Sequence, residues 1–90
     1  MTLRTRFLDA IIDGELGNGL VVTRQEFINY FSDENPKTTG CFLSNSEIDT
    51  GQPHSPMYSH FTLRVDEGVY RVHPGALNAR MVDRKILAPV

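Results

Sequence analysis

The segment FTLRVDEGVYRVHP, residues 61–74, contains the clearest β-hairpin pattern of this chain. Two short runs of alternating residues flank the polar turn sequence DEG, residues 66–68. Gly68 can adopt the positive φ that a three-residue hairpin loop requires. The pattern therefore predicts two antiparallel strands joined by a tight turn. The apolar residues that alternate with more polar neighbours along these strands are Leu63, Val65, Tyr70 and Val72.

A second local pattern, the sequence TRQEFINYF that begins at Thr23, predicts a helix. The Thr23 hydroxyl can accept a hydrogen bond from the N–H of Glu26, and the Glu26 carboxylate can reach back to the N–H of Thr23. Val22 before this capping box and Phe27 after it can form a hydrophobic staple. We expect a helix over residues 24–32. Its inward face would consist of Phe27, Ile28 and Phe31.

The chain before this helix has apolar residues at helical spacing, which predicts a first helix over residues 3–13. Thr2 can cap its start, and Gly14 can end it. The β-branched run GLVVT then predicts one short strand over residues 20–22. The apolar face of the first helix would consist of Leu3, Phe7, Leu8, Ile11 and Ile12.

The dipeptide Asn35-Pro36 predicts the start of a third helix, because asparagine favours the N-cap and proline is well tolerated at the first helical position. This helix would run over residues 36–45. A rival start is Ser44, which can form a capping box of its own with Glu47. The inward residues of the third helix would be Phe42 and Leu43.

A last helix is expected to begin at Pro74, with Leu77 and Met81 facing inward. We expect residues 83–90 to form a flexible tail. Positive charge near the end of a helix interacts favourably with the helix dipole. The residues that supply it are Arg80, Arg84 and Lys85.

The composition is typical of a small globular protein. The 90 residues are 40% hydrophobic and 22% charged, with a net charge of −2. This length suits one domain over residues 1–90, with a core over about residues 3–82. No apolar run approaches the ~20 residues of a membrane helix, and the N-terminus lacks the pattern of a signal peptide. These features and the single Cys41, which excludes an internal disulfide, favour the cytoplasm.

The predicted order of elements is helix, short strand, helix, helix, two-stranded hairpin and helix. This order resembles a winged helix-turn-helix domain, an α+β fold with a three-helix core and a β-hairpin called the wing. The resemblance is carried by the strand-to-helix sequence GLVVTRQEF, the turn SDENP before the third helix and the hairpin FTLRVDEGVYRV. It covers about residues 3–82. Winged helices serve as DNA readers and as protein-docking modules, so the fold leaves both functions open.

In this family the third helix lies in the major groove, and the wing touches the DNA backbone or the minor groove. The resemblance therefore implies a small non-enzymatic protein that binds double-stranded DNA in a regulatory or accessory role, without a cofactor. Asparagine can read adenine, hydroxyls can bind phosphates, and a guanidinium suits a phosphate or a narrow minor groove. Arg64 and Arg71 would lie on the outward face of the wing, and Arg4, Arg6 and Arg24 could flank them. The residues implied on the third helix are Lys37, Thr38, Ser44 and Asn45.

The charge distribution favours an alternative function. Residues 25–55 contain five carboxylates against the single Lys37, and the predicted wing tip Asp66-Glu67 is also acidic. DNA affinity depends largely on neutralised phosphates, so an acidic surface weakens it. The alternative is an acidic protein-interaction module or small inhibitor that docks through residues 33–49; a homodimer through the first or last helix is also open. Residues suited to such an interface, or else to a half-buried core, are Tyr30, Met57, Tyr58 and Tyr70.

The two hairpin arginines also have a second interpretation. Arg64 and Arg71 can form an exposed cross-strand pair whose charges discourage edge-to-edge pairing with another sheet. In that case they would protect the hairpin and bind no ligand.

Metal binding and catalysis find little support in the sequence. The residue types of a zinc site occur at Cys41, His54, His60 and His73, but the spacings of 13, 6 and 13 match no compact ligand pair. We therefore expect no metal, a buried Cys41, and histidines at surface or capping positions. No nucleophile lies at a recognisable spacing from a base, so we expect no enzymatic activity.

Overall fold

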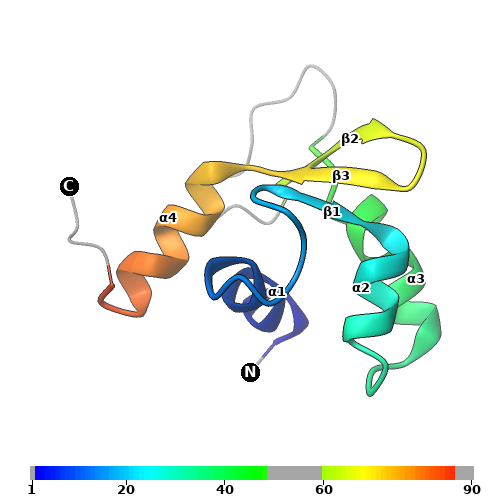
Figure 1. The fold of residues 1–90 in the computed structure, drawn as a ribbon, viewed down its shortest axis with the longest axis horizontal. Helices are drawn as coiled ribbons and strands as arrows, with labels where there is room; N and C mark the ends of the chain where they lie inside the picture. Colours follow the sequence, from blue (N-terminus) through cyan, green and yellow to red (C-terminus); the bar gives the residue numbers. More distant parts are fainter. Residues whose placement is uncertain (1, 49–59, 87–90) are drawn as a thin grey trace.

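Residues 2–48 and 60–86 are described by the computed structural model of the chain. Within these ranges the protein is an α+β fold of four helices and one three-stranded antiparallel sheet with strand order β1-β3-β2 (Figure 1). Helix α1 packs against α4, and α2 packs against α3. None of the described helices is long and apolar enough to cross a membrane. In chain order the elements are α1 (Leu3–Ile12), β1 (Val21–Thr23), α2 (Arg24–Tyr30), α3 (Pro36–Asn45), β2 (Thr62–Asp66), β3 (Val69–Val72) and α4 (Pro74–Asp83).

The start of α3 confirms the helix start that Asn35-Pro36 predicts. Asn35 is the N-cap, and its side chain accepts a hydrogen bond from the backbone N–H of Lys37 at 2.9 Å. Pro36 occupies the first turn, where its missing N–H costs nothing. The rival start at Ser44 is wrong, because this residue lies in the last turn of the same helix.

The other predicted boundaries are confirmed to within two residues. The Thr23–Glu26 capping box is present, with both hydrogen bonds at 3.1 Å. Helix α2 ends at Tyr30, because the φ of −99° and ψ of 43° at Phe31 leave the helical region. Strand β1 begins one residue after the predicted start, and the predicted tail over residues 83–90 begins within α4. Residues 87–90 lie outside the described part of the chain.

The core is built around a cluster of phenylalanines contributed by several elements. The ring of Phe7 in α1 lies 5.1 Å from the ring of Phe27, 5.9 Å from that of Phe42 and 6.0 Å from that of Phe61. Aromatic pairs at such distances stabilise a core beyond the area that they bury. The cluster therefore fixes α1 against both α2 and α3.

The inward face of β2 differs from the prediction. Thr62 is completely buried, whereas Leu63 and Val65 are 50% and 52% exposed. The Thr62 hydroxyl donates a 2.7 Å hydrogen bond to the backbone carbonyl of Leu43 in α3, so burial of this polar group leaves no unmet hydrogen bond. Residue Asp66 pairs with Val69, which leaves a bulge between Arg64 and Asp66. The prediction that Arg64 lies on the outward face, which would turn its neighbours Leu63 and Val65 inward, is wrong.

The two hairpin arginines lie on opposite faces of the sheet. Arg64 pairs with Tyr70, and Arg71 pairs with Leu63. Directly opposed residues of an antiparallel pair project to the same face, and neighbours along a strand project to opposite faces. Arg64 therefore lies on the face where Tyr70 is buried, and Arg71 lies on the exposed face with Leu63. The prediction that both share one outward face, as grips or as a cross-strand pair, is wrong.

An ion-pair cluster joins α1 to α4. The guanidinium of Arg80 donates two hydrogen bonds to the carboxylate of Asp9, at 2.8 and 3.1 Å. Arg84 adds contacts to Asp9 at 3.5 Å and to Asp13 at 3.1 Å. The Asp9 and Arg80 side chains are only 20% and 22% exposed, so solvent screens this pair less than an ordinary surface pair.

We expect Asp9→Asn to destabilise the protein by about 2 kcal/mol at neutral pH, because it removes charge-assisted hydrogen bonds. The hydrogen bond from Arg80 holds the pKa of Asp9 below its ordinary value, with the charges of Arg80 and Arg84 acting in the same direction against desolvation. A depressed pKa in the folded state gives stability that is present above the unfolded-state pKa and lost as the pH falls through the folded-state pKa. Urea unfolding from about pH 7 to about pH 2 should therefore show a flatter acid limb for Asp9→Asn. Glu67→Gln, at an exposed carboxylate without an ion pair in the described structure, is the control and should change the free energy of unfolding at neutral pH by less than about 0.5 kcal/mol.

Candidate nucleic-acid interface

The exposed face of α3 brings together all four residues that the sequence predicts on this helix. Lys37, Thr38, Ser44 and Asn45 are all exposed, and their spacing places them on one side of the helix. Thr39 and Leu43 on the opposite side are 2% exposed. The packing of the buried side thus presents ammonium, hydroxyl and amide groups together to solvent.

Cys41 lies in the middle of this polar face and is exposed. The prediction of a buried cysteine is therefore wrong. Its place follows from helical periodicity, since residues 39 and 43 face the core and position 41 falls between them on the opposite side.

Arg24 fastens α3 to the start of α2. Its Nε donates a 3.0 Å hydrogen bond to the backbone carbonyl of Gly40, in the middle of α3. A Cβ at Gly40 would lie 3.1 Å from a terminal nitrogen of the same guanidinium, so the glycine allows this close approach. Arg24 is exposed and keeps further N–H donors, and it lies at the junction of the two helices next to the polar face.

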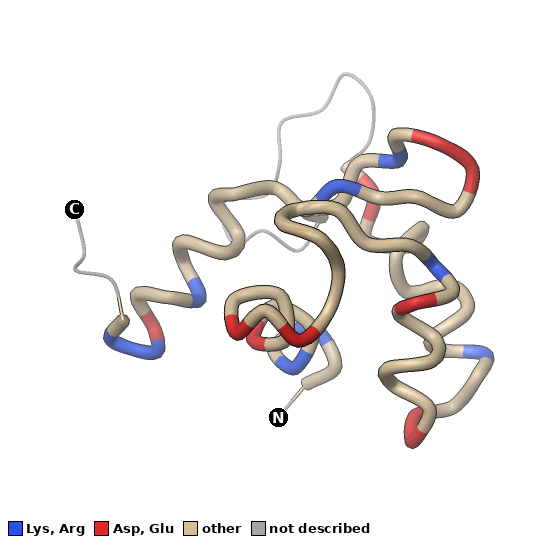
Figure 2. Tube along the Cα trace, viewed as in Figure 1, with Lys and Arg blue, Asp and Glu red and all other residues tan. Residues whose placement is uncertain are grey.

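The hairpin places one arginine, Arg64, on the face of the sheet that is directed toward the helices. Strand β2 contacts α3, and Arg64 lies on the face of β2 that is directed toward the helices. The turn beyond it carries the exposed carboxylates of Asp66 and Glu67 (Figure 2). An anionic ligand near α3 would therefore be attracted by Arg64 and repelled by the tip of the hairpin.

Arg6 is occupied by intramolecular contacts. Its guanidinium contacts Glu34 at 2.6 Å and Asp33 at 3.1 Å, and it lies 5.1 Å from the centre of the Phe31 ring. It therefore compensates two of the carboxylates that make the predicted region 33–49 acidic. No local signal could have revealed this, because the partners are 27 and 28 residues apart in sequence.

The arginines in and just after the last turn of α4 are likewise engaged with acids in and just after α1. Arg80 and Arg84 bind Asp9 and Asp13, as described above. The cations near α3 that form no ion pair within the described residues are therefore Arg24, Lys37 and Arg64.

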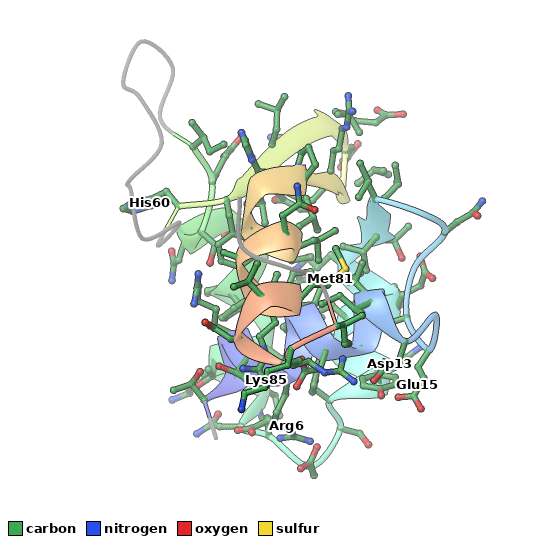
Figure 3. The ribbon with its side chains drawn as sticks, turned by 90° about the vertical axis from the view of Figure 1, so that its left-hand side faces the viewer. Arg6, Asp13, Glu15, His60, Met81 and Lys85 are labelled. Atoms are coloured by element: carbon green, nitrogen blue, oxygen red, sulfur yellow. The ribbon has the colours of Figure 1, made fainter. Side chains whose placement is uncertain are left out.

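The candidate metal residues do not converge in the part of the chain that the structure describes. No group of three histidine, cysteine, aspartate or glutamate side chains there could hold a metal ion. His73 caps α4, where its Nδ1 accepts a 2.9 Å hydrogen bond from the N–H of Gly75, which confirms a capping histidine. His60 is exposed. Figure 3 shows it well away from the carboxylates of Asp13 and Glu15, which could otherwise have joined it in a metal site. His54 lies outside the described residues.

The tyrosines divide between core and surface. Tyr70 is buried. Tyr30 is 40% exposed and donates a 2.6 Å hydrogen bond to Glu15, which raises the pKa of the phenol. Met57 and Tyr58 fall outside residues 2–48 and 60–86, so their proposed interface role is not placed.

Comparisons with protein-family models, with curated proteins and with solved structures find no match to this chain. The functional assignment therefore depends on the fold and on the chemistry of the α3 face and the hairpin.

Proposed function

We propose that this chain is a winged-helix domain that binds double-stranded DNA through α3 and the hairpin β2–β3. Its role would be regulatory or accessory, with no catalytic step and no cofactor. In this proposal α3 enters the major groove, and the hairpin is the wing that contacts the backbone.

The element order and the sheet topology support the winged-helix assignment. Helix α1 precedes strand β1, α2 and α3 follow, and the hairpin β2–β3 then pairs with β1 through β3. Such a sheet places the hairpin beside the end of α3, the arrangement in which a wing and a recognition helix can reach one duplex. Fold alone does not decide function, so the weight of the proposal lies on the side chains of α3.

The single observation that carries DNA binding is the exposed polar face of α3. Asn45 can present two hydrogen bonds to adenine, Ser44 and Thr38 can bind a phosphate or a base edge, and Lys37 can neutralise a phosphate. Within the described residues none of these four side chains is needed for the core, because all four are exposed. Since the solvent-facing side of any surface helix is polar, the proposal rests on the particular groups that this face offers.

The available positive charge predicts moderate affinity. Only Arg24, Lys37 and Arg64 lie near α3 without an ion pair among the described residues. Three phosphate contacts correspond to a loss of roughly fortyfold in affinity between about 50 and about 200 mM salt. Binding should therefore be weaker and less sensitive to salt than that of a strongly basic DNA-binding domain.

Fluorescence anisotropy with a labelled random duplex tests this proposal. We expect Lys37→Ala and Arg64→Ala each to weaken binding several-fold and to reduce the salt slope by about 1. Arg71→Ala is the matched control, because Arg71 lies on the opposite face of the same hairpin and should not contact DNA.

Two results would contradict the proposal. Absence of binding at about 50 mM salt would exclude general DNA affinity at the strength that three phosphate contacts give. An equal effect of Arg71→Ala and Arg64→Ala would show that the hairpin does not approach DNA from the α3 side.

Docking on a protein through residues 33–49 is the alternative function. Glu47 is half-buried, and Arg6 compensates the charges of Asp33 and Glu34. The described part of this region thus offers little uncompensated negative charge for a basic partner, and we rank this function below DNA binding.

A further inference from the structure

The face of the sheet that points away from the helices is apolar and uncovered by the described residues. Val21, Leu63 and Val65 are 37%, 50% and 52% exposed. The register aligns Val21 of β1 and Leu63 of β2 on either side of Arg71 of β3. Val69, two residues before Arg71 on β3, projects to the same side. We call these residues, together with Asp66 opposite Val69, the outer sheet face.

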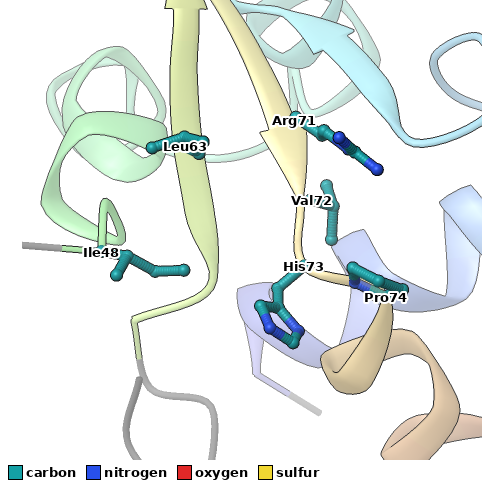
Figure 4. A pocket seen from close by; sticks show the side chains of 6 residues that line it. All are labelled: Ile48, Leu63, Arg71, Val72, His73 and Pro74. Atoms are coloured by element: carbon teal, nitrogen blue, oxygen red, sulfur yellow. The ribbon is translucent and has the colours of Figure 1, made fainter. Parts of the chain in front are cut away.

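A hollow adjoins this face between Ile48 beside β2 and the end of β3, where α4 begins (Figure 4). Its volume is about 160 Å³, and its lining is mainly aliphatic. Ile48 lies next to β2 because its N–H donates a 2.7 Å hydrogen bond to the carbonyl of Thr62. The residues that line the hollow are Ile48, Leu63, Arg71, Val72, His73 and Pro74.

The outer sheet face carries one positive and one negative side chain that do not bind each other. The register places Arg71 and Asp66 on neighbouring strands, two residue pairs apart, on the same face. No ion pair of either group occurs within the described residues. Among the residues that the structure describes, the Asp66 carboxylate accepts one hydrogen bond, from the N–H of Glu67 at 2.7 Å. The face is therefore apolar with balanced and unpaired charges.

We propose that the outer sheet face binds a second copy of this chain. A two-fold axis that passes midway between Arg71 and Asp66 brings Arg71 of each copy against Asp66 of the other, and it packs the exposed valines and Leu63 between them. A partner of one charge sign would gain one attractive contact and one repulsive contact on this face. A second copy gains two attractive contacts, so the charge pattern favours self-association.

Face-to-face packing is favoured over edge-to-edge pairing of β2. The outward backbone groups of Thr62 are already taken, since its N–H binds the carbonyl of Ser46 and its carbonyl binds the N–H of Ile48. The bulge between Arg64 and Asp66 interrupts the remaining edge. Bulges of this kind hinder the addition of a further strand.

The size of the face predicts a weak dimer. Three strands ~4.8 Å apart and about four residues long cover roughly 200 Å² of sheet. A standard interface buries ~800 Å² on each partner, so this smaller face predicts a weak dimer, and we take a Kd on the order of 100 μM as the value to test. The expected dimer would form without DNA, and the inference does not depend on DNA binding.

Sedimentation equilibrium from about 10 μM to about 1 mM, a range that brackets this Kd, tests the proposal. Arg71→Glu and Asp66→Arg should each raise the Kd at least about tenfold, because each places two like-charge contacts in the symmetric interface. Arg64→Glu is the matched control: it reverses a charge on the other face of the same hairpin and should leave the Kd unchanged. Circular dichroism of each variant would verify that the fold is retained.

Mixing the two charge-reversed variants is the decisive step. An Arg71→Glu chain paired with an Asp66→Arg chain has opposite charges at both contacts, so the mixture should dimerise with a Kd near that of the unmodified chain. An unmodified chain that stays monomeric at about 1 mM would overturn the proposal. A mixture that stays monomeric, or a dimer lost in Arg64→Glu but kept in Arg71→Glu, would overturn it as well.

Discussion

Replacing Phe7 by alanine is expected to lower the free energy of unfolding by about 3–5 kcal/mol. The ring is completely buried and meets three other phenylalanine rings at centroid distances of 5.1, 5.9 and 6.0 Å. Alanine would leave a cavity that neighbours from different elements cannot fill together. Since a domain of this length has a total stability of about 5–13 kcal/mol, the variant should lose much of its stability. Urea unfolding followed by far-ultraviolet circular dichroism measures the change.

Leu63→Ala is the matched control for this substitution. Leu63 is 50% exposed on the outer sheet face, so its truncation removes a large side chain without leaving a core cavity. We expect a change below about 1 kcal/mol. If Phe7→Ala destabilised no more than Leu63→Ala, the aromatic cluster would not be the centre of the core.

Local interactions made the helices predictable from the sequence. The Thr23–Glu26 capping box and the Asn35–Lys37 cap join residues two or three positions apart, so the participating residues are visible in a short stretch. The predicted third helix over residues 36–45 coincides with α3 for this reason. The four polar residues of its exposed face were predicted from the position of this helix and from the resemblance to winged helices.

The inward face of the hairpin could not be predicted by the same reasoning. Threonine and leucine alternate in β2, and apolarity alone favours an inward leucine. The carbonyl of Leu43, which lies 19 residues earlier, satisfies the buried hydroxyl of Thr62 and reverses this choice. A shift of one residue in register moves every side chain of a strand to the other face, so the sequence alone did not reveal that Arg64 and Arg71 lie on opposite faces.

Long-range ion pairs changed the electrostatic interpretation most. In the sequence, residues 25–55 carry five carboxylates against the single Lys37, and no local pattern pairs these acids with arginines. In the folded chain Arg6 binds Asp33 and Glu34, and the arginines of α4 bind acids of α1. These contacts lower both the negative charge near α3 and the number of cations available for DNA. The salt dependence expected of DNA binding is therefore that of about three contacts.

The second large effect is expected at Gly17, where replacement by alanine should destabilise the protein by about 2–4 kcal/mol. Gly17 has a φ of +78°, a left-handed conformation that costs a side-chain-bearing residue about 1–2 kcal/mol. An added Cβ would also lie 2.6 Å from the backbone oxygen of Val21 and 3.3 Å from Cδ1 of Ile11. The Val21 oxygen accepts a 2.8 Å hydrogen bond from the N–H of Asn18, so relief of the clash would disturb the turn that leads into β1.

Gly19→Ala separates the two causes of this loss. Gly19 has a φ of +64°, but an added Cβ would meet no atom of the described residues within 4 Å. It should therefore cost only about 1 kcal/mol, because the reduced freedom of the unfolded chain offsets part of the backbone strain. Urea unfolding of both variants gives the difference, which measures the contacts of the added Cβ with Val21 and Ile11. Equal losses at the two positions would mean that Gly17 does not approach Val21, and that backbone conformation alone requires glycine in this loop.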